Sequence, residues 1–176
     1  MRIVIVYESL FGNTHEIAEA IGDGLREARP DAQIACLRVA EASPDATAAA
    51  DLLLVGGPTH MRGMSRSVSR KMALKVDMRV DESEAGHEPE EGAEGPGVRD
   101  WFHTLPKAVQ GARAAAFDTR GDARMSGGAA PAIARRLRHH GYTLAAEPEG
   151  FIVEDAEGPL REGERSRARA WGSALV

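Results

Sequence analysis

The opening of the chain, a buried strand that runs into a polar loop and then a helix, constrains the fold more than any other segment. Residues 3–6 are the continuous β-branched run Ile-Val-Ile-Val, which is typical of a parallel strand covered on both faces. The loop that follows contains Gly12, which can adopt the positive φ that a sharp turn requires. Apolar residues then recur at helical spacing, at Ile17, Ile21 and Leu25. The sequence therefore predicts a strand–loop–helix unit of an α/β fold.

The same loop is suited to bind a phosphate. Free backbone N–H groups and the helix dipole favour an anion at a helix N-terminus, and Ser9 and Thr14 add hydroxyls. Asn13 followed by Glu16 is a capping-box pattern, which predicts that the helix begins at Asn13 or Thr14. The loop lacks the Lys-containing motif of nucleoside-triphosphate loops and the Gly-x-Gly-x-x-Gly fingerprint of dinucleotide-binding loops. A phosphate here would be held by hydroxyls and backbone amides; an ordinary strand–helix connection is the alternative.

Strand-like and helix-like segments alternate through the rest of the chain. Further strands are predicted at 33–39, 51–55, 111–118 and, bent or split near 148–150, at 142–153. Further helices are predicted at 64–75, 98–106, 127–140 and 162–175, and residues 56–63 are predicted to form an irregular loop. Such alternation implies a parallel sheet with right-handed crossovers. At 176 residues the chain fits one domain, 1–176.

One acidic segment departs from this alternation. From Asp81 to Glu94 there are seven acidic residues and no Lys or Arg, within an excursion that spans about residues 77–97. We expect the excursion to be solvated and flexible and to bury almost nothing. It follows a basic stretch made of Arg62, Arg66, Arg70, Lys71, Lys75 and Arg79. The alternative is an acidic flap that folds back onto the basic stretch or meets a basic partner.

Composition argues against several classes of protein. The net charge of −5 and the isoelectric point near 5.7 are unlike those of general nucleic-acid binders. The lone Cys36 cannot form an internal disulfide and is expected to be a buried core thiol. The sequence has neither an apolar run long enough to span a membrane nor a secretory leader. We therefore expect a cytoplasmic protein with no membrane span and no nucleic-acid partner.

Two loops carry a resemblance to a known family. Ser9-Leu-Phe-Gly-Asn-Thr14 closely resembles the FMN-phosphate loop of flavodoxins, with Phe11 in place of the usual middle Thr. The loop after the third strand contains Gly-Gly-Pro-Thr at 56–59, which resembles the stretch that contacts the isoalloxazine ring in flavodoxins and in flavodoxin-like quinone reductases. The resemblance implies FMN as cofactor. It also implies a flavodoxin-like three-layer sandwich with a five-stranded parallel sheet in the order 2-1-3-4-5.

The resemblance also implies where FMN would bind. Ligands of such sheets lie beyond the carboxyl ends of the strands, so the loops after strands one, three and four should converge. For the phosphate we expect Ser9, Leu10, Phe11, Gly12, Asn13 and Thr14. For the ring and the opposite side of the site we expect Pro58, Thr59, His60, Met61, Gly63, Asp118, Thr119, Arg120 and Arg124. The two arginines would compensate a flavin anion, hold a substrate, or simply be solvated charges. No catalytic residue and no metal ligand is expected.

Three functions are compatible with these residues. The leading hypothesis is an FMN-binding flavodoxin-like protein of electron transport, which exchanges electrons with a redox partner protein, either a reductase or an acceptor. An FMN-dependent NAD(P)H:quinone-type oxidoreductase, with NAD(P)H or a quinone as substrate, is the alternative. The third is a flavin-free binding or regulatory module. We expect a redox carrier rather than a stand-alone oxidoreductase.

Overall fold

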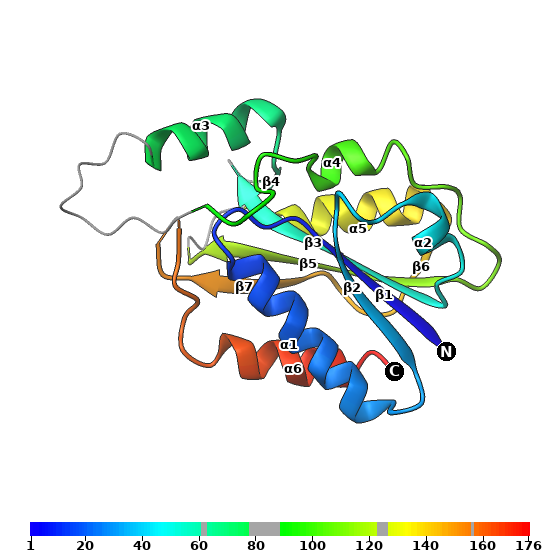
Figure 1. Cartoon of the computed structure of the whole chain (residues 1–176). Helices are drawn as coiled ribbons and strands as arrows, with labels where there is room; N and C mark the ends of the chain where they lie inside the picture. Colours follow the sequence, from blue (N-terminus) through cyan, green and yellow to red (C-terminus); the bar gives the residue numbers. More distant parts are fainter. Residues whose placement is uncertain (61–62, 78–88, 123–126, 156) are drawn as a thin grey trace.

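A parallel sheet with helices on both faces forms the structure, a computed structural model that describes residues 1–60, 63–77, 89–122, 127–155 and 157–176 (Figure 1). The strands are β1 (Arg2–Tyr7), β2 (Gln33–Arg38), β3 (Leu52–His60), β4 (Gly63–Met64), β5 (Arg113–Gly121), β6 (Thr143–Leu144) and β7 (Glu149–Val153). The helices are α1 (Asn13–Ala28), α2 (Pro44–Ala48), α3 (Ser67–Asp77), α4 (Val98–Trp101), α5 (Ala129–His139) and α6 (Glu164–Ser173).

The predicted strand order is confirmed. The sheet runs β2-β1-β3-β5-β6, and β7 also pairs with β5. β5 is thus the fourth strand of the predicted order, and the fifth position is divided between β6 and β7, which both run parallel to β5. The predicted split falls between Leu144 and Glu149, where Pro148 cannot donate a ladder hydrogen bond.

Two hydrophobic cores cover the two faces of the sheet. On one face α1 and α6 lie side by side over a core that contains Phe117 and Phe151 (Figure 1). These two helices approach closely: a Cβ on Gly24 would stand 1.9 Å from a backbone oxygen of α6, and one on Gly172 would stand 2.4 Å from a backbone oxygen of α1. On the other face α4 and α5 cover a core that contains Trp101. β1 and β3 thus lie in the middle of the sandwich, with helices covering both of their faces.

The third strand is longer than predicted, so the prediction of an irregular loop over 56–63 is wrong for its described residues. β3 continues to His60 and keeps its pairing with β5 up to Pro58, after which β4 pairs back antiparallel. Gly56 explains the extension, because a Cβ there would lie 2.1 Å from the Phe117 ring. Because position 56 has no Cβ, β3 continues past the buried Phe117 ring without a clash.

The described end of the acidic excursion is packed, contrary to the expectation that it buries almost nothing. The Glu90 N–H donates to the Leu10 carbonyl at 2.7 Å, and its carboxylate lies 2.5 Å from Nδ1 of His15. The Glu90 side chain is only 18% exposed. Glu90 therefore lies against the first loop, and Ala93 is buried, whereas Pro89, Glu91, Gly92 and Glu94 are exposed as expected. Residues 78–88 lie outside the described part of the chain.

Cys36 is half-buried, against the core beneath α1. Burial raises the pKa of its thiol to about 12, so the thiol stays protonated at neutral pH. This agrees with a packing role and not with a nucleophilic one. In the described ranges of the chain, no helix has the length and apolar character needed to cross a membrane.

Candidate functional site

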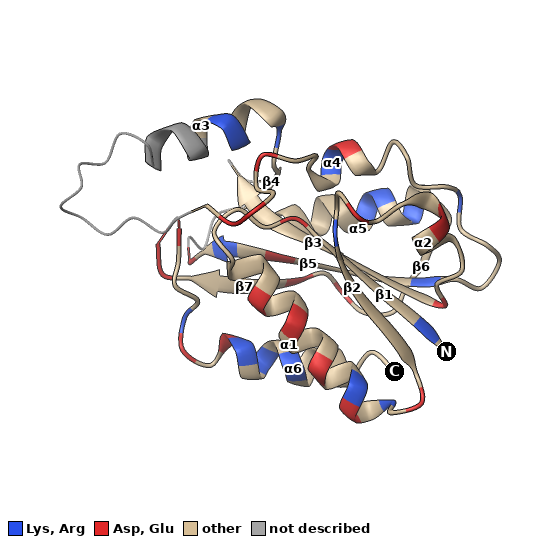
Figure 2. Cartoon of the chain, viewed as in Figure 1, with Lys and Arg blue, Asp and Glu red and all other residues tan. Residues whose placement is uncertain are grey.

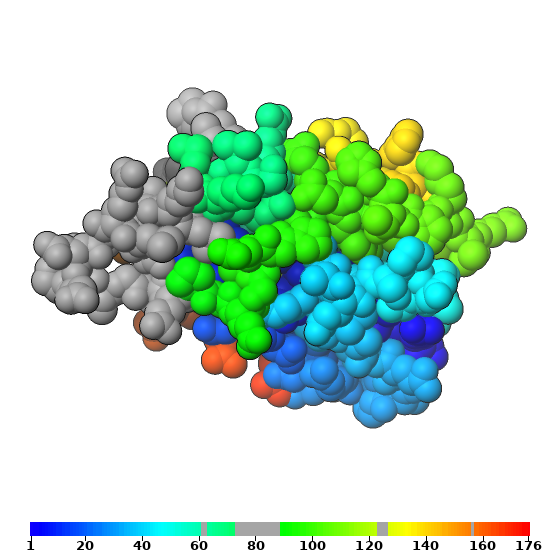
Figure 3. Space-filling model, turned by 45° about the horizontal axis from the view of Figure 1, so that its top comes forward, coloured from blue at the N-terminus to red at the C-terminus, as the bar shows by residue number. Residues whose placement is uncertain are grey.

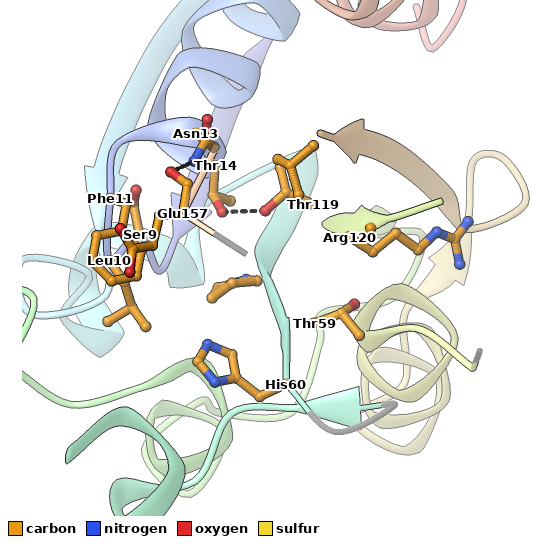
Figure 4. Close-up of a pocket in the computed structure, with 13 residues that line it drawn as sticks. Ser9, Leu10, Phe11, Asn13, Thr14, Thr59, His60, Thr119, Arg120 and Glu157 are labelled. Atoms are coloured by element: carbon orange, nitrogen blue, oxygen red, sulfur yellow. Dashed lines mark hydrogen bonds between the residues drawn. The ribbon is translucent and has the colours of Figure 1, made fainter. Parts of the chain in front are cut away.

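A pocket of about 380 Å³ lies at the carboxyl ends of the central strands (Figure 4). Its volume falls in the range of about 300–1,000 Å³ that is usual for small-molecule and cofactor sites. The lining comes from four segments, which are the first loop, the end of β3, the end of β5 and the stretch after β7. The lining residues are Ser9, Leu10, Phe11, Asn13, Thr14, Pro58, Thr59, His60, Thr119, Arg120, Gly121, Val153 and Glu157.

The first loop turns into α1 through Gly12, which has a φ of 88°. The Gly12 N–H donates to Oγ of Ser9 at 3.1 Å, and the Gly12 carbonyl accepts from the Glu16 N–H at 2.9 Å. The helix begins at Asn13, as predicted, but the predicted capping box is wrong because no side chain caps this end. The Asn13 amide instead donates to the Glu157 carbonyl at 2.8 Å and ties the loop to the stretch after β7.

A pair of hydroxyls closes the inner end of the pocket. Oγ1 of Thr14 and Oγ1 of Thr119 lie 2.7 Å apart, and both residues are buried (Figure 4). Each hydroxyl has one hydrogen to donate, and the pair uses only one of the two. The other O–H is left for a ligand. Ser9 also retains its O–H, because its oxygen acts as the acceptor for Gly12.

These donors suit an anion. They lie at the N-terminus of a 16-residue helix, where the dipole and the first backbone N–H groups favour negative charge. Two hydroxyl hydrogens converge there from different elements. Among the described side chains, the lining has one cation, Arg120, and its guanidinium is turned away from the cavity (Figure 4). The pocket therefore offers a phosphate neutral donors and a helix end.

The opposite side of the pocket is formed by Pro58, Thr59 and His60. The Thr59 hydroxyl is committed to the wall, since it donates to Asp118 at 3.1 Å and accepts from the Ala129 N–H at 2.9 Å. The His60 imidazole, by contrast, has no hydrogen-bond partner among the described residues. Burial, and to a smaller extent the Arg70 charge, lowers the pKa of His60 below its usual 6.5, so that the ring is neutral at pH 7.

Three of the expected site residues that the structure describes do not line the pocket, namely Gly12, which forms the turn into α1, and Asp118 and Gly63. Asp118 is fully buried behind the wall, where its Oδ2 accepts from the Ala130 N–H at 2.8 Å and fixes the start of α5. Burial raises the pKa of Asp118 in spite of these donors and of Arg120 beside it. Gly63 pairs with His60 in the β3–β4 hairpin and does not line the pocket. Met61 and Arg124 lie outside the described residues.

Arg120 touches both the pocket and the fold. Its stem lines the pocket, while its Nε lies 3.5 Å from the Asp118 carboxylate. The guanidinium covers β7 at Gly150, where a Cβ would stand 2.1 Å from it. The Arg120 guanidinium therefore lies beside a buried carboxyl group of the fold.

The stretch after β7 is the wall that sequence reasoning missed. Glu157 lines the pocket from there, Val153 lines it from the end of β7 itself, and Gly121 lines it from the end of β5. The signal was present, because Gly158 and Pro159 mark a turn after the last predicted strand, and that strand ends at the same edge of the sheet. In the part of the chain that the structure describes, no group of His, Cys, Asp or Glu residues is arranged to hold a metal ion.

Comparisons with known proteins agree with this geometry. The sequence model of the flavodoxin family matches residues 5–93. Flavodoxin 1 from Bacillus cereus superposes with a TM-score of 0.67 at 15% identity, covering 100% of this chain and 97% of that one. Megasphaera elsdenii flavodoxin in its two-electron reduced form gives a TM-score of 0.59 at 23% identity, covering 98% and 97%. A flavodoxin from the domain Archaea gives a TM-score of 0.61 at 21% identity, covering 99% of this chain and 96% of that one. At these identities the likeness shows the fold. The search of curated protein sequences finds no match.

Proposed function

The chain belongs to the flavodoxin family of FMN-binding electron-transfer proteins, and we propose that the pocket at the carboxyl ends of β1, β3, β5 and β7 is its FMN site. The observation that carries this assignment is the hydroxyl pair of Thr14 and Thr119 at the N-terminus of α1. It gives one end of the pocket a donor set suited to a phosphate, while the rest of the lining is mostly apolar. FMN has the same division between an anionic end and a flat, largely apolar ring.

The first loop would hold the phosphate. Ser9 and Thr14 donate from their hydroxyls, and the backbone N–H groups at the start of α1 donate beside them. Asn13 contributes indirectly, because its amide fastens the loop to Glu157 and so fixes the width of this end of the pocket. A loop held in advance loses little entropy when the ligand binds.

The ring would lie between the first loop and the end of β3. Leu10, Phe11 and Pro58 supply apolar contacts, and His60 supplies a polar side chain that forms no hydrogen bond within the described part of the chain. Bound FMN supplies the redox chemistry, while the protein orients it and sets the charge around it. Because the neutral His60 imidazole carries one N–H and one bare nitrogen, it can donate to or accept from the ring edge without adding charge.

We infer that the protein acts as a carrier between a reductase and an acceptor. The support is the family and a pocket with donors for a phosphate at one end and apolar side chains beside them. A cytoplasmic site of action is part of this proposal, supported by the single cysteine in the sequence. If NADPH alone reduced the FMN-loaded protein at a catalytic rate, the oxidoreductase alternative would replace the carrier.

Two glycines provide a matched test of the phosphate site. Gly12 and Gly163 both precede a helix with positive φ, 88° and 86°, and neither has an atom near its missing Cβ. Replacing either with Val imposes the same backbone strain. We expect Gly12→Val to weaken FMN binding, measured by quenching of flavin fluorescence, by at least about a hundredfold. Gly163→Val should leave the affinity unchanged.

Riboflavin, which lacks the phosphate, is the ligand control. Its affinity should change little in Gly12→Val, because only the phosphate end of the site is altered. Equal FMN affinity in the Gly12 and Gly163 variants would place the phosphate elsewhere, and equal losses of FMN and riboflavin would indicate a collapsed pocket.

A further inference from the structure

Three arginines from separate segments lie together on the face formed by α4 and α5. Arg99 of α4 donates from Nε to the Ser65 carbonyl at 3.2 Å and from Nη2 to the Met64 carbonyl at 3.2 Å, which places its guanidinium next to Arg66. Arg136 of α5 lies over the Phe102 ring, with its guanidinium carbon 5.8 Å from the ring centre. Phe102 directly follows α4. We call Arg66, Arg99 and Arg136 the arginine patch.

The charge of the patch is only partly compensated, because Asp100 and Glu8 act on the pKa of Arg99 in the upward direction but less than burial and the neighbouring arginines act downward. Within the described residues, none of its three arginines has a carboxylate within 4.0 Å, whereas arginines on the opposite face of the sheet, such as Arg167 and Arg169 of α6, are paired. The nearby acid on α4, Asp100, is bound to Arg70 at 2.9 Å. Burial, and then the charges of Arg66 and Arg136, lowers the pKa of Arg99. This mutual repulsion would be relieved by an anionic surface laid against the patch.

Figure 2 shows how the charges are distributed. Above the sheet, α5 carries basic residues and α4 carries one basic and one acidic residue, while below the sheet acidic residues run along α1 and basic residues along α6. Figure 3 shows the start of α3 and α4 side by side on one continuous surface, with α5 behind them. The overall charge of −5 therefore conceals a basic face.

The patch lies one strand away from the pocket. Met64 accepts a hydrogen bond from Arg99 at its carbonyl and pairs with Thr59 across the β3–β4 hairpin. Thr59 in turn lines the pocket beside His60. Arg66 follows two residues later. A partner seated on the patch would thus reach the His60 side of the pocket. Glu90, the described end of the acidic segment, lies instead at the first loop.

We propose that the arginine patch is the docking surface for the redox partner and that the partner's docking face is acidic. The inference rests on the proposed function, because it takes the pocket as the FMN site. Attraction between opposite charges would speed the encounter and turn the His60 side of the pocket toward the partner's redox centre.

Two small oxidants of opposite charge test the proposal. The full chain is loaded with FMN, reduced, and oxidised in a stopped-flow instrument by ferricyanide, an anion, or by tris(phenanthroline)cobalt(III), a cation. Each oxidant accepts one electron per ion from the reduced flavin. We expect the ferricyanide rate to fall as salt rises and the cobalt rate to increase, opposite to what the net charge of −5 predicts. A ferricyanide rate that increases with salt would overturn the proposal.

Paired variants separate local charge from net charge. Arg66→Gln/Arg136→Gln removes two charges from the patch, and Arg165→Gln/Arg169→Gln removes two from α6. At low salt we expect the patch variant to react with ferricyanide more slowly by about threefold or more, and the α6 variant to match the unaltered protein. Equal slowing in both variants would overturn the proposal.

A basic cytochrome c serves as a protein acceptor. It should react faster with the patch variant than with the unaltered protein, and a slower reaction would assign the patch to basic partners instead. FMN affinity is measured first for every variant. If the unaltered protein fails to bind FMN, the proposed function is wrong. If FMN affinity is normal but the patch variant reacts at the same rates as the unaltered protein, only the proposed docking surface is wrong.

Discussion

The hydroxyl pair at the inner end of the pocket makes a quantitative prediction about FMN affinity. A hydrogen bond to a charged group contributes about 1.5–3 kcal/mol and one between neutral groups about 0.5–1.5 kcal/mol. If Thr14 donates to the phosphate, Thr14→Val should weaken FMN binding by about 10- to 150-fold. Thr119 would act through Thr14: its hydroxyl would donate to Oγ1 of Thr14, 2.7 Å away, and so direct the Thr14 hydroxyl hydrogen toward the phosphate. Thr119→Val should therefore weaken FMN binding by about 2- to 12-fold.

The double variant distinguishes this relay from two independent contacts. Without the Thr14 hydroxyl, Thr119 has lost the group through which it acts, so Thr14→Val/Thr119→Val should bind FMN about as weakly as Thr14→Val alone. The coupling free energy should then equal the whole effect of Thr119→Val. If the two losses multiply, the hydroxyls act separately and the reasoning is refuted. If Thr119→Val causes the larger loss, the direction of donation is reversed.

The assay is quenching of FMN fluorescence at pH 7, with riboflavin titrated in parallel. Riboflavin affinity should vary by less than about twofold among the variants, because the hydroxyl hydrogen in question reaches only the phosphate. Each single substitution also leaves a buried hydroxyl without its partner. Urea unfolding of the FMN-free proteins therefore accompanies the titration, so that every affinity is measured on folded protein.

Other perturbations follow from the core and the pocket walls. Gly56→Ala should lower the free energy of unfolding by about 3 kcal/mol or more because its Cβ meets a buried ring at 2.1 Å, while Gly63→Ala, with open space there, should change it little in the same urea titration. The free energy of unfolding of the FMN-free protein should fall as the pH drops below 6.5, because His60 has a lowered pKa in the folded protein and so takes up its proton first in the unfolded chain. His60→Gln should reduce this loss of stability, and a variant with an unchanged pH profile would contradict the prediction. Glu90→Ala should quicken hydrogen exchange of the amide at position 90, which donates to Leu10, by about tenfold or more, and unchanged protection would show that the backbone contact alone holds this segment.

Local patterns were enough to predict the frame of the molecule. The β-branched run at 3–6 and the apolar spacing of α1 determine the first unit, and the alternation that follows allows few topologies. The first loop, the end of β3 and the end of β5 converge because parallel strands end at one edge. These are properties of segments a few residues long, or of rules that hold for all such sheets.

Side-chain roles across the pocket were not predictable in the same way. Asn13 has a capping residue's sequence context, yet its amide finds a partner 144 residues away. Asp118 was expected beside the ligand, but its side chain projects from the face of β5 that meets the start of α5. In each case a partner brought close by tertiary folding outweighs the local preference. The length of β3 also depended on a neighbour, the Phe117 ring that only glycine at position 56 can accommodate.

The bond between Asn13 and Glu157 has a consequence for how the protein is made. Its two ends are separated by 144 residues, so at a synthesis rate of about 5–20 residues per second the first loop waits roughly 7–30 s for its opposite wall to emerge from the ribosome. The helix that packs against α1 is later still, because α6 follows that wall in the chain. FMN capture at the proposed site is therefore a late event, and a nascent chain halted before residue 157 would carry the first loop but no closed pocket.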